Sequence, residues 1–336
     1  MAFVHKKNNF DSLRLLAATT VLLSHQFALM GLPEPKPFPD TTWGTLSVMV
    51  FFVISGYWVT QSWMADPHLG RFVSRRLLRL LPGLCFVVLI SLFVLGPIVT
   101  DLSLSDYFSS GKTWRYLNNI RLAIVYELPG VFVGNPYPRI VNGSLWTLPV
   151  EARWYLVVAG TGLLGFMRFK HALLLAWIMG AWFYGRQISP DGLQHPDVFW
   201  TFGIFFLAGM RLSISKLPHQ IVILLGVVAL FSFYLGAWFF GLAIALPLLV
   251  TVIGLSAFPF LKEVGRLGDL SYGVYIFAFP VQQTVIRFLG PTMTHAPLLL
   301  ISLVVTYALA FVSWHAVESP ALQLKRKLQS TKKSPI

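Results

Sequence analysis

The sequence predicts an all-α, polytopic membrane protein with about ten transmembrane helices. Of its 336 residues, 56% are hydrophobic and 12% are charged, about half the charged share of an ordinary soluble protein. The apolar residues recur in runs long enough to cross a bilayer as helices, and not as the alternating ten-residue strands of an outer-membrane barrel. Together these observations exclude a single soluble globular domain.

Ten apolar segments, taken in chain order, are the predicted spans. They are residues 11–31, 43–64, 77–99, 144–166, 171–186, 198–212, 219–236, 238–258, 269–289 and 297–317. The first four have the length of about 20 residues that crosses a hydrocarbon core of about 30 Å, whereas the fifth and sixth are shorter.

The uncharged stretch from 221 to 261 is about twice as long as one crossing requires. We therefore divide it into the seventh and eighth helices, which turn near Gly236. The last two segments complete the membrane domain, and Pro320 is expected to end the final helix because proline cannot continue the hydrogen-bond ladder.

The basic residues indicate the orientation of the chain. Most of them fall in the loops and tails that share one side of the membrane if the N-terminus is cytoplasmic. The positive-inside rule then places both termini in the cytoplasm and accounts for most of the net charge of +13 without a nucleic-acid partner. The first apolar segment is too long for a cleavable signal peptide. The single cysteine, Cys85, excludes an internal disulfide.

Two domains are predicted: a transmembrane domain over residues 1–320 and a basic cytoplasmic tail over 321–336, which is expected to be disordered. Two outer loops are also notable, the proline-rich residues 32–42 and the long stretch 100–143. Their aromatic and asparagine side chains suit stacking and hydrogen bonding to a sugar. Anchoring of the aromatics at the membrane interface is the alternative interpretation.

Arg14 and His25 are ionisable residues inside the first apolar segment, where such groups are costly and usually functional. Their separation of 11 residues places them on one helix face, within about 20° and roughly 16 Å apart along the axis. A guanidinium and an imidazole on one face suggest the two ends of a reactive channel. The alternative is a structural histidine capped by a backbone carbonyl of a neighbouring helix.

Four arginines, Arg71, Arg75, Arg76 and Arg79, lie in RFVSRRLLRLLP on the predicted cytoplasmic side. Their spacings of three and four residues gather them on one broad face of a helix. The planar guanidinium binds phosphates through paired hydrogen bonds, which favours an anion site. The alternative is a topology signal or a cluster that contacts lipid headgroups.

Glu151 enters the membrane from the outer side in SLWTLPVEARWYL. Pro149 is expected to break the helix there and to free backbone carbonyls that line a cavity. A buried glutamate suggests function, with Arg153 or a basic residue of another helix as its partner. A purely structural ion pair is the alternative.

Ser55 and Gly56 in FFVISGYWV favour close helix packing, with a ligand tunnel as the alternative. His315 and Glu318 near the end of the last span are interpreted as interfacial residues. No metal site is predicted, because the eight histidines are dispersed and lack a thiolate partner. The nucleophile elbow GxSxG and a glycine-rich phosphate loop are also missing, which removes the common hydrolase and nucleotidase classes.

The chain resembles acyltransferase family 3, the membrane O-acyltransferases of bacterial surface glycans, lipids and antibiotics. The similar segments follow in order: NNFDSLRLLAATTVLLSH, FFVISGYW, RRLLRLLP, NGSLWTLPVEARWYL, GDLSYGVYIFAFPVQQ and VESP. The basic-x10-His pattern of the family falls on Arg14 and His25, and its Arg-x-x-Arg pattern on Arg76 and Arg79. Ala278 stands where many members carry a histidine.

The resemblance implies a donor, acetyl-CoA, whose phosphates bind Arg75, Arg76 and Arg79. We expect an O-acetyltransferase of the bacterial inner membrane that acetylates a hydroxyl of a lipid-linked or exported polysaccharide. His25 is the expected general base, or forms an acetyl-histidine. Arg14, steadied by Asp11, assists it, while Ser144, Trp146 and Glu151 line the acceptor side. The alternative function is a transporter or flippase of an acylated or anionic small molecule.

Overall fold

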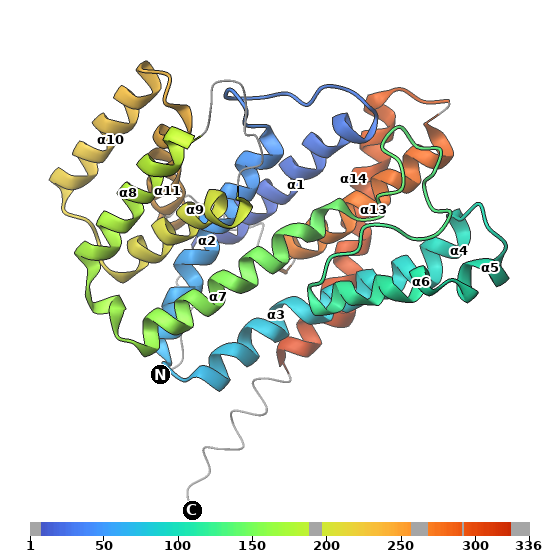
Figure 1. The fold of residues 1–336 in the computed structure, drawn as a ribbon, viewed down its shortest axis with the longest axis horizontal. Coiled ribbons are helices and arrows are strands. Elements are labelled where there is room, and N and C mark those ends of the chain that lie inside the picture. The colour runs from blue at the N-terminus through green and yellow to red at the C-terminus, as the bar shows by residue number, and fades with distance from the viewer. Residues whose placement is uncertain (1–7, 188–196, 257–267, 291, 324–336) are drawn as a thin grey trace, which may run out of the picture. The chain divides into compact units, whose positions relative to one another are not determined.

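The computed structural model describes residues 8–187, 197–256, 268–290 and 292–323. The regular structure in these ranges is helical, accompanied by two isolated β-bridges, Phe38–Thr41 and Glu127–Ile140. The predicted all-α class is therefore confirmed (Figure 1). Most of the predicted tail, residues 324–336, lies outside the described residues.

A helix occupies each of the ten predicted segments. The long helices are α1 (Phe10–Leu29), α2 (Trp43–Ala65), α3 (Leu69–Ile90), α7 (Thr147–Leu163), α8 (Lys170–Gln187), α9 (Val198–Ile214), α10 (His219–Tyr234), α11 (Trp238–Leu255), α13 (Ser271–Leu289) and α14 (His295–Ser313). The main difference is α3, which begins at Leu69 and not at residue 77, so that the whole arginine run is helical. The predicted turn is present at Gly236, whose φ of +77° is accessible to glycine without strain.

Short helices replace part of the predicted outer loop. They are α5 (Leu104–Ser109) and α6 (Gly111–Arg115), followed by the 3-10 helix η2 (Tyr116–Arg121). The short helix α4 (Gly96–Val99) precedes them and ends the third predicted span. Ser103 and Ser110 cap α5 and α6 by accepting hydrogen bonds from the backbone N–H groups of Asp106 and Lys112.

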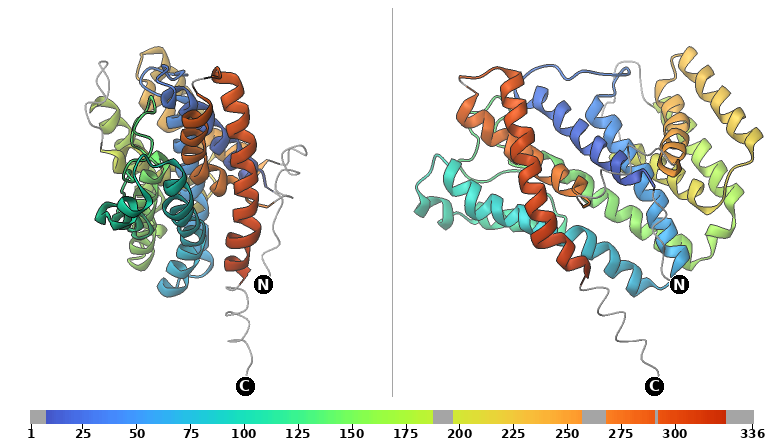
Figure 2. Two further views of the ribbon diagram at one scale, coloured as in Figure 1. Left: turned by 90° about the vertical axis from the view of Figure 1, so that its right-hand side faces the viewer. Right: turned by 180° about the vertical axis from the view of Figure 1, so that it is seen from behind.

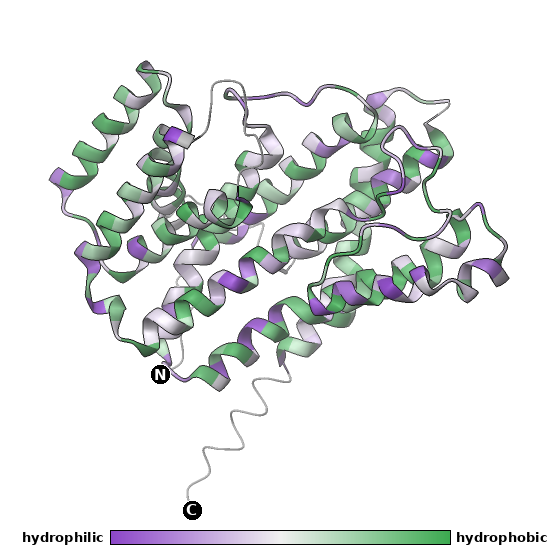
Figure 3. Ribbon diagram, viewed as in Figure 1, coloured by the Kyte–Doolittle hydropathy of each residue, from purple (hydrophilic) through white to green (hydrophobic). Residues whose placement is uncertain are grey.

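Four helical stretches of the described residues are long and apolar enough to cross a membrane: Trp43–Ala65, Leu69–Val99, Trp238–Leu255 and His295–Gln323. Other helices present apolar side chains outward. Leu224 and Leu230 of α10 are 60% and 70% exposed, and this helix is hydrophobic along most of its length (Figure 3). Such surfaces are typical of lipid contact, and the chain is a multi-pass membrane protein.

The chain forms two compact units, and three of the boundaries between them fall within α1, α3 and α7. The first unit comprises Met1–Ala17, Lys36–Phe72 and Val150–Arg266, and the second comprises Ala18–Pro35, Val73–Pro149 and Leu267–Ile336. In the first unit α2 packs along α9, and α11 contacts α8, α9 and α10. In the second unit α13 packs along α14, as both views of Figure 2 show.

Glycines allow α2 and α9 to touch at the backbone. A Cβ atom added to Gly56 would lie 2.0 Å from the carbonyl oxygen of Phe206, and one added to Gly209 would lie 2.1 Å from that of Val53. No side chain fits in these gaps. The packing interpretation of Gly56 is therefore confirmed.

Gly56→Ala and Gly209→Ala should each destabilise the protein by about 1–3 kcal/mol or more, because a methyl group would force two helix backbones apart. The measurement is the apparent Tm in detergent. Gly160→Ala in α7 is the matched control, since its added Cβ meets nothing within 4 Å. Equal Tm values for Gly56→Ala and Gly160→Ala would contradict the packing assignment.

Pro149 does not break a helix, contrary to the prediction. It lies in the first turn of α7, which begins at Thr147. The N–H groups of a first helical turn have no acceptor within the helix, so a proline there removes no hydrogen bond. Because the 3-10 helix η3 (Gly143–Trp146) leads directly into α7, the segment enters the helix without an interruption.

Pro320 also fails to end its helix, which continues to Gln323. A π-turn, η6 (Trp314–Glu318), precedes it, and the Ser319 N–H bonds to the Trp314 carbonyl across this wider turn. The changed hydrogen-bond register accommodates the proline ring that would clash in a regular α-helix. The same order occurs after α3, where the π-turn η1 (Ser91–Leu95) is followed by Gly96 and Pro97.

Candidate active site

The predicted site residues divide between the two units, and each unit is described by itself. Arg14 and Glu151 belong to the first unit, and His25, Arg75, Arg76, Arg79, Ser144 and Trp146 to the second. Arg14 and His25 lie on the same helix, α1, as predicted. Arg14 is half-buried near the start of this helix.

The His25 ring packs against an aromatic side chain of α13. Its centroid lies 5.5 Å from that of Phe279, with the rings at 77°, an edge-to-face arrangement. The Nδ1 atom is buried, and no described residue gives it a hydrogen bond. The alternative of a histidine capped by a backbone carbonyl is therefore not supported at Nδ1. The residue as a whole is half-buried.

Phe279 also connects His25 to the segment that carries Ser144. A Cβ atom added to Gly143 would lie 2.5 Å from the Phe279 ring, so glycine is needed where η3 passes this side chain. Ser144 follows it and is buried. Its carbonyl accepts a hydrogen bond of 3.0 Å from the Tyr275 hydroxyl, while its own Oγ has no partner among the described residues. The structure thus brings His25 and the segment of Ser144 and Trp146 to one aromatic side chain.

Sequence reasoning missed two buried amides beside this histidine. Gln282 Nε2 donates hydrogen bonds of 2.8 Å to the Leu22 carbonyl and to Gln26 Oε1. Both glutamine side chains are completely buried in apolar helices. The sequence contained a signal for them, since both glutamines stand in apolar segments. Burying an amide is costly unless it forms hydrogen bonds, so such a residue indicates a bonded partner. The pair joins α1 to α13 next to His25.

Glu34 is a second residue that was missed. Its Oε2 atom accepts a hydrogen bond of 2.5 Å from Ser24 Oγ, and Ser24 precedes His25 in α1. This bond brings the start of the proline-rich loop back onto the helix that carries the predicted base. Glu34 and Asp40 are the acids of that loop, which was the available signal.

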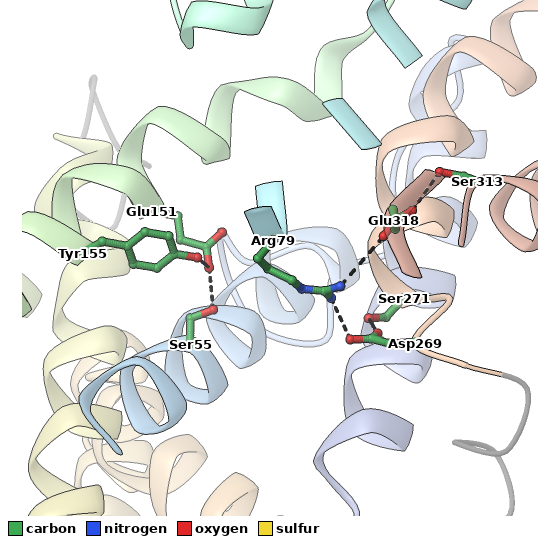
Figure 4. Close-up of polar contacts among 8 residues, drawn as sticks. All are labelled: Ser55, Arg79, Glu151, Tyr155, Asp269, Ser271, Ser313 and Glu318. Carbon is green, nitrogen blue, oxygen red and sulfur yellow. Dashed lines mark hydrogen bonds and ion pairs between the residues drawn. The ribbon is translucent and has the colours of Figure 1, made fainter. Parts of the chain in front are cut away.

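Arg79 of the arginine run is held by two carboxylates of its own unit (Figure 4). Its Nη2 lies 2.7 Å from Asp269 Oδ2, and its Nη1 lies 3.8 Å from Glu318 Oε2. The side chain of Glu318, which the sequence analysis interprets as interfacial, is 2% exposed and is therefore covered by protein. Glu318 lies in the π-turn η6, where its Oε1 atom accepts a hydrogen bond of 2.7 Å from Ser313 Oγ.

The other arginines of the run differ in environment. Arg75 and Arg76 are half-buried on α3, four and three residues before Arg79. Arg71 is more exposed, and its Nε and Nη2 atoms bond both oxygens of Asp66. The spacing therefore correctly predicts one helical face, but Arg71 is occupied by a local carboxylate.

Glu151 accepts hydrogen bonds from two hydroxyls, and not from the predicted cation. Ser55 Oγ of α2 and Tyr155 Oη of α7 both lie 2.6 Å from Glu151 Oε1. Figure 4 shows the second carboxylate oxygen turned away from both hydroxyls. Arg153 is exposed. The predicted ion pair with Arg153 is replaced by neutral donors, one of them a tyrosine at the i+4 position.

Comparison with known proteins identifies the family. The family model described as "Acyltransferase domain" matches residues 7–315, nearly the whole chain. The chain belongs to acyltransferase family 3.

This membrane acyltransferase is similar to curated proteins over most of its length. It is 31% identical to an O-acetyl transferase of Shigella phage Sf6, over 94% of this chain and 96% of that protein. It is 29% identical to nodulation protein 10 of Rhizobium leguminosarum bv. viciae, over 96% of this chain and 95% of that protein. The peptidoglycan O-acetyltransferase OatA of Listeria monocytogenes is 22% identical, over 93% of this chain and 55% of that protein. No solved structure matches significantly.

In this acyltransferase the second unit offers an imidazole and a group of guanidinium ions, and the first unit offers a carboxylate. Among the described residues no three His, Cys, Asp or Glu side chains are grouped to hold a metal ion. An imidazole without a partner at Nδ1 can accept a proton from a hydroxyl. Half-buried guanidinium groups can bind phosphate oxygens through charge-assisted hydrogen bonds.

Proposed function

We propose that the protein transfers an acetyl group from cytoplasmic acetyl-CoA to a hydroxyl of a lipid-linked or exported polysaccharide. Family membership and the O-acetyltransferases among the relatives support the reaction. The single observation that carries the mechanism is His25, whose buried Nδ1 lacks a described partner within an apolar helix.

In the proposed mechanism His25 acts as the general base. It accepts the proton of the acceptor hydroxyl while that oxygen attacks the thioester carbonyl, and the proton then passes to the departing thiolate of CoA. Acetyl-CoA supplies the activated acetyl thioester. An acetyl-histidine intermediate is the variant mechanism, in which the imidazole itself is the nucleophile.

The remaining residues have binding and electrostatic roles in this proposal. Arg75, Arg76 and Arg79 hold the donor phosphates, and the half-buried positions of all three on one helix suit that task. Arg14 stabilises charge that develops along α1. Ser144, Trp146 and Glu151 contact the acceptor sugar, whose hydroxyls suit the carboxylate oxygen that Ser55 and Tyr155 leave open.

The reaction is tested with purified protein in detergent or proteoliposomes. With acetyl-CoA and a candidate polysaccharide, free CoA should appear together with one acetyl ester per CoA, as measured by thiol titration and mass spectrometry of the glycan. Uptake of acetylated glycan into vesicles without release of CoA would support the transporter alternative instead.

We also propose ten membrane spans in the bacterial inner membrane, with both termini in the cytoplasm, on the basis of the loop charges. Single cysteines at Ser109 and Ser330 in a Cys85→Ala background test this. Ser109 is exposed at the end of α5 and should react with an impermeant maleimide added to spheroplasts, whereas Ser330 should not. The reverse labelling pattern would overturn the orientation.

A further inference from the structure

Two carboxylates from different helical segments face the Arg79 guanidinium. Asp269, two residues before α13, lies 2.7 Å from Nη2, and Glu318 in the π-turn after α14 lies 3.8 Å from Nη1. Tyr272 covers one face of the guanidinium at 5.5 Å from the ring centroid. Three segments that are far apart in the sequence therefore meet at one cation (Figure 4).

Each carboxylate is oriented by a serine. Ser271 Oγ donates a hydrogen bond of 2.5 Å to Asp269 Oδ1, and Ser313 Oγ donates one of 2.7 Å to Glu318 Oε1. In both cases the serine holds one carboxylate oxygen while the other faces Arg79. Such support from neighbouring groups keeps both anions directed at the guanidinium.

The two carboxylates differ in distance and in burial. Asp269 makes a charge-assisted hydrogen bond, and its side chain is 19% exposed, similar to the 21% of Arg79. Glu318 is beyond hydrogen-bond distance and only 2% exposed. Asp269 is therefore the carboxylate that an incoming anion can replace, while Glu318 remains as a fixed counter-charge.

A phosphate and Asp269 would compete for the N–H donors of one guanidinium. A phosphate that binds in the bidentate manner needs two of the five N–H groups of Arg79, and Asp269 already accepts a hydrogen bond from Nη2. An aspartate that stays nearby also repels the phosphate through space. Both effects have the same sign, because each lowers the affinity for a phosphorylated ligand.

We propose that Asp269 is a competing anion for Arg79, which weakens the binding of the phosphates shared by acetyl-CoA and CoA and speeds the release of CoA. This inference rests on the proposed function, in which Arg75, Arg76 and Arg79 hold these phosphates. A carboxylate that merely orients Arg79 would have the opposite effect, since its loss would weaken binding.

Asp269→Asn is the decisive variant, because asparagine can still accept the Ser271 hydrogen bond while it lacks the charge. CoA should bind at least on the order of tenfold more tightly, because a like charge as far away as roughly 10 Å already has that effect at an effective permittivity of about 20. Calorimetric titration of the full-length protein measures this. The KM for S-acetylpantetheine, which has no phosphate, should stay unchanged.

Asp101→Asn is the matched control. Asp101 Oδ1 lies 3.0 Å from Arg287 Nη2 in the same unit, a comparable but more exposed ion pair outside the arginine run. Its CoA affinity should equal that of the wild type. In an Arg79→Ala background the gain from Asp269→Asn should shrink, because the competition for Arg79 is gone.

Unchanged or weaker CoA binding in Asp269→Asn would overturn the competition. The CoA affinity of Arg76→Ala then shows whether only the competition by Asp269 is wrong, or also the proposed binding of the phosphates at the arginines. If Arg76→Ala weakens CoA binding while Asp269→Asn has no effect, the donor site stands and the competition fails. If neither variant changes the affinity, the donor site itself is elsewhere.

Discussion

His25→Ala should lose about 100- to 10,000-fold in acetyl transfer, the usual contribution of a general base. Donor affinity should stay close to that of the wild type, because the proposed phosphate site is a separate group of arginines. Histidine suits this task because the ordinary pKa of a free imidazole, about 6.5, leaves it mostly neutral at pH 7 and able to accept a proton.

His25→Gln tests basicity separately from shape, since glutamine keeps a hydrogen-bonding group of similar reach but cannot take the proton. It should be as inactive as His25→Ala. His295→Ala is a matched control. This second histidine also packs against an aromatic ring, with its ring centroid 4.3 Å from that of Phe27. It also has a buried ring nitrogen without a described hydrogen-bond partner. Its turnover should remain near the wild-type value.

The measurement is the rate of acetyl-ester formation at saturating donor, together with a calorimetric Kd for acetyl-CoA. Retention of more than about a tenth of wild-type turnover in either His25 variant is a smaller loss than a general base should give, and would remove the catalytic assignment. An equal loss in His295→Ala would show that packing near α1, and not the His25 imidazole, limits the rate.

Arg76→Ala should weaken acetyl-CoA binding by roughly tenfold to a hundredfold. A charge-assisted hydrogen bond to phosphate contributes about 1.5–3 kcal/mol, and each 1.4 kcal/mol corresponds to about tenfold in Kd. The acetyl-CoA affinity of Arg76→Lys should fall between those of Arg76→Ala and the wild type, since lysine keeps the charge but cannot form the paired hydrogen bonds.

Arg71→Ala is the matched control for this prediction. Arg71 lies on the same helix, five residues earlier in the sequence, but it already bonds both oxygens of Asp66. Its loss should leave the Kd unchanged. If Arg76→Ala and Arg71→Ala both bind acetyl-CoA as the wild type does, the arginine run serves topology or lipid headgroups.

The helices of this protein were predictable because each depends on local sequence. A run of about 20 apolar residues forms a helix in lipid, since every backbone polar group must be bonded within the segment. This argument located ten helices and the turn at Gly236. Residue spacing within one helix was equally reliable, and it placed Arg75, Arg76 and Arg79 on α3 and both Arg14 and His25 on α1.

The partners of these residues depended on tertiary structure. Arg79 meets Asp269 across 190 residues of chain, and Glu151 meets Ser55 across 96. Periodicity says which face of a helix a residue occupies, but not which helix faces it. The predicted pair of Glu151 with Arg153 therefore gave way to hydroxyls from α2 and α7.

By itself the sequence determined the helical class, the family and the residues available for chemistry, because these follow from composition, run length and local motifs. Only the tertiary structure decided that the last helix continues through Pro320 after a π-turn, that Glu318 is buried and that Arg79 lies next to two carboxylates. The physical reason is that burial and ion pairing are set by the packing of distant segments, whose contacts outweigh the local preferences that a sequence displays.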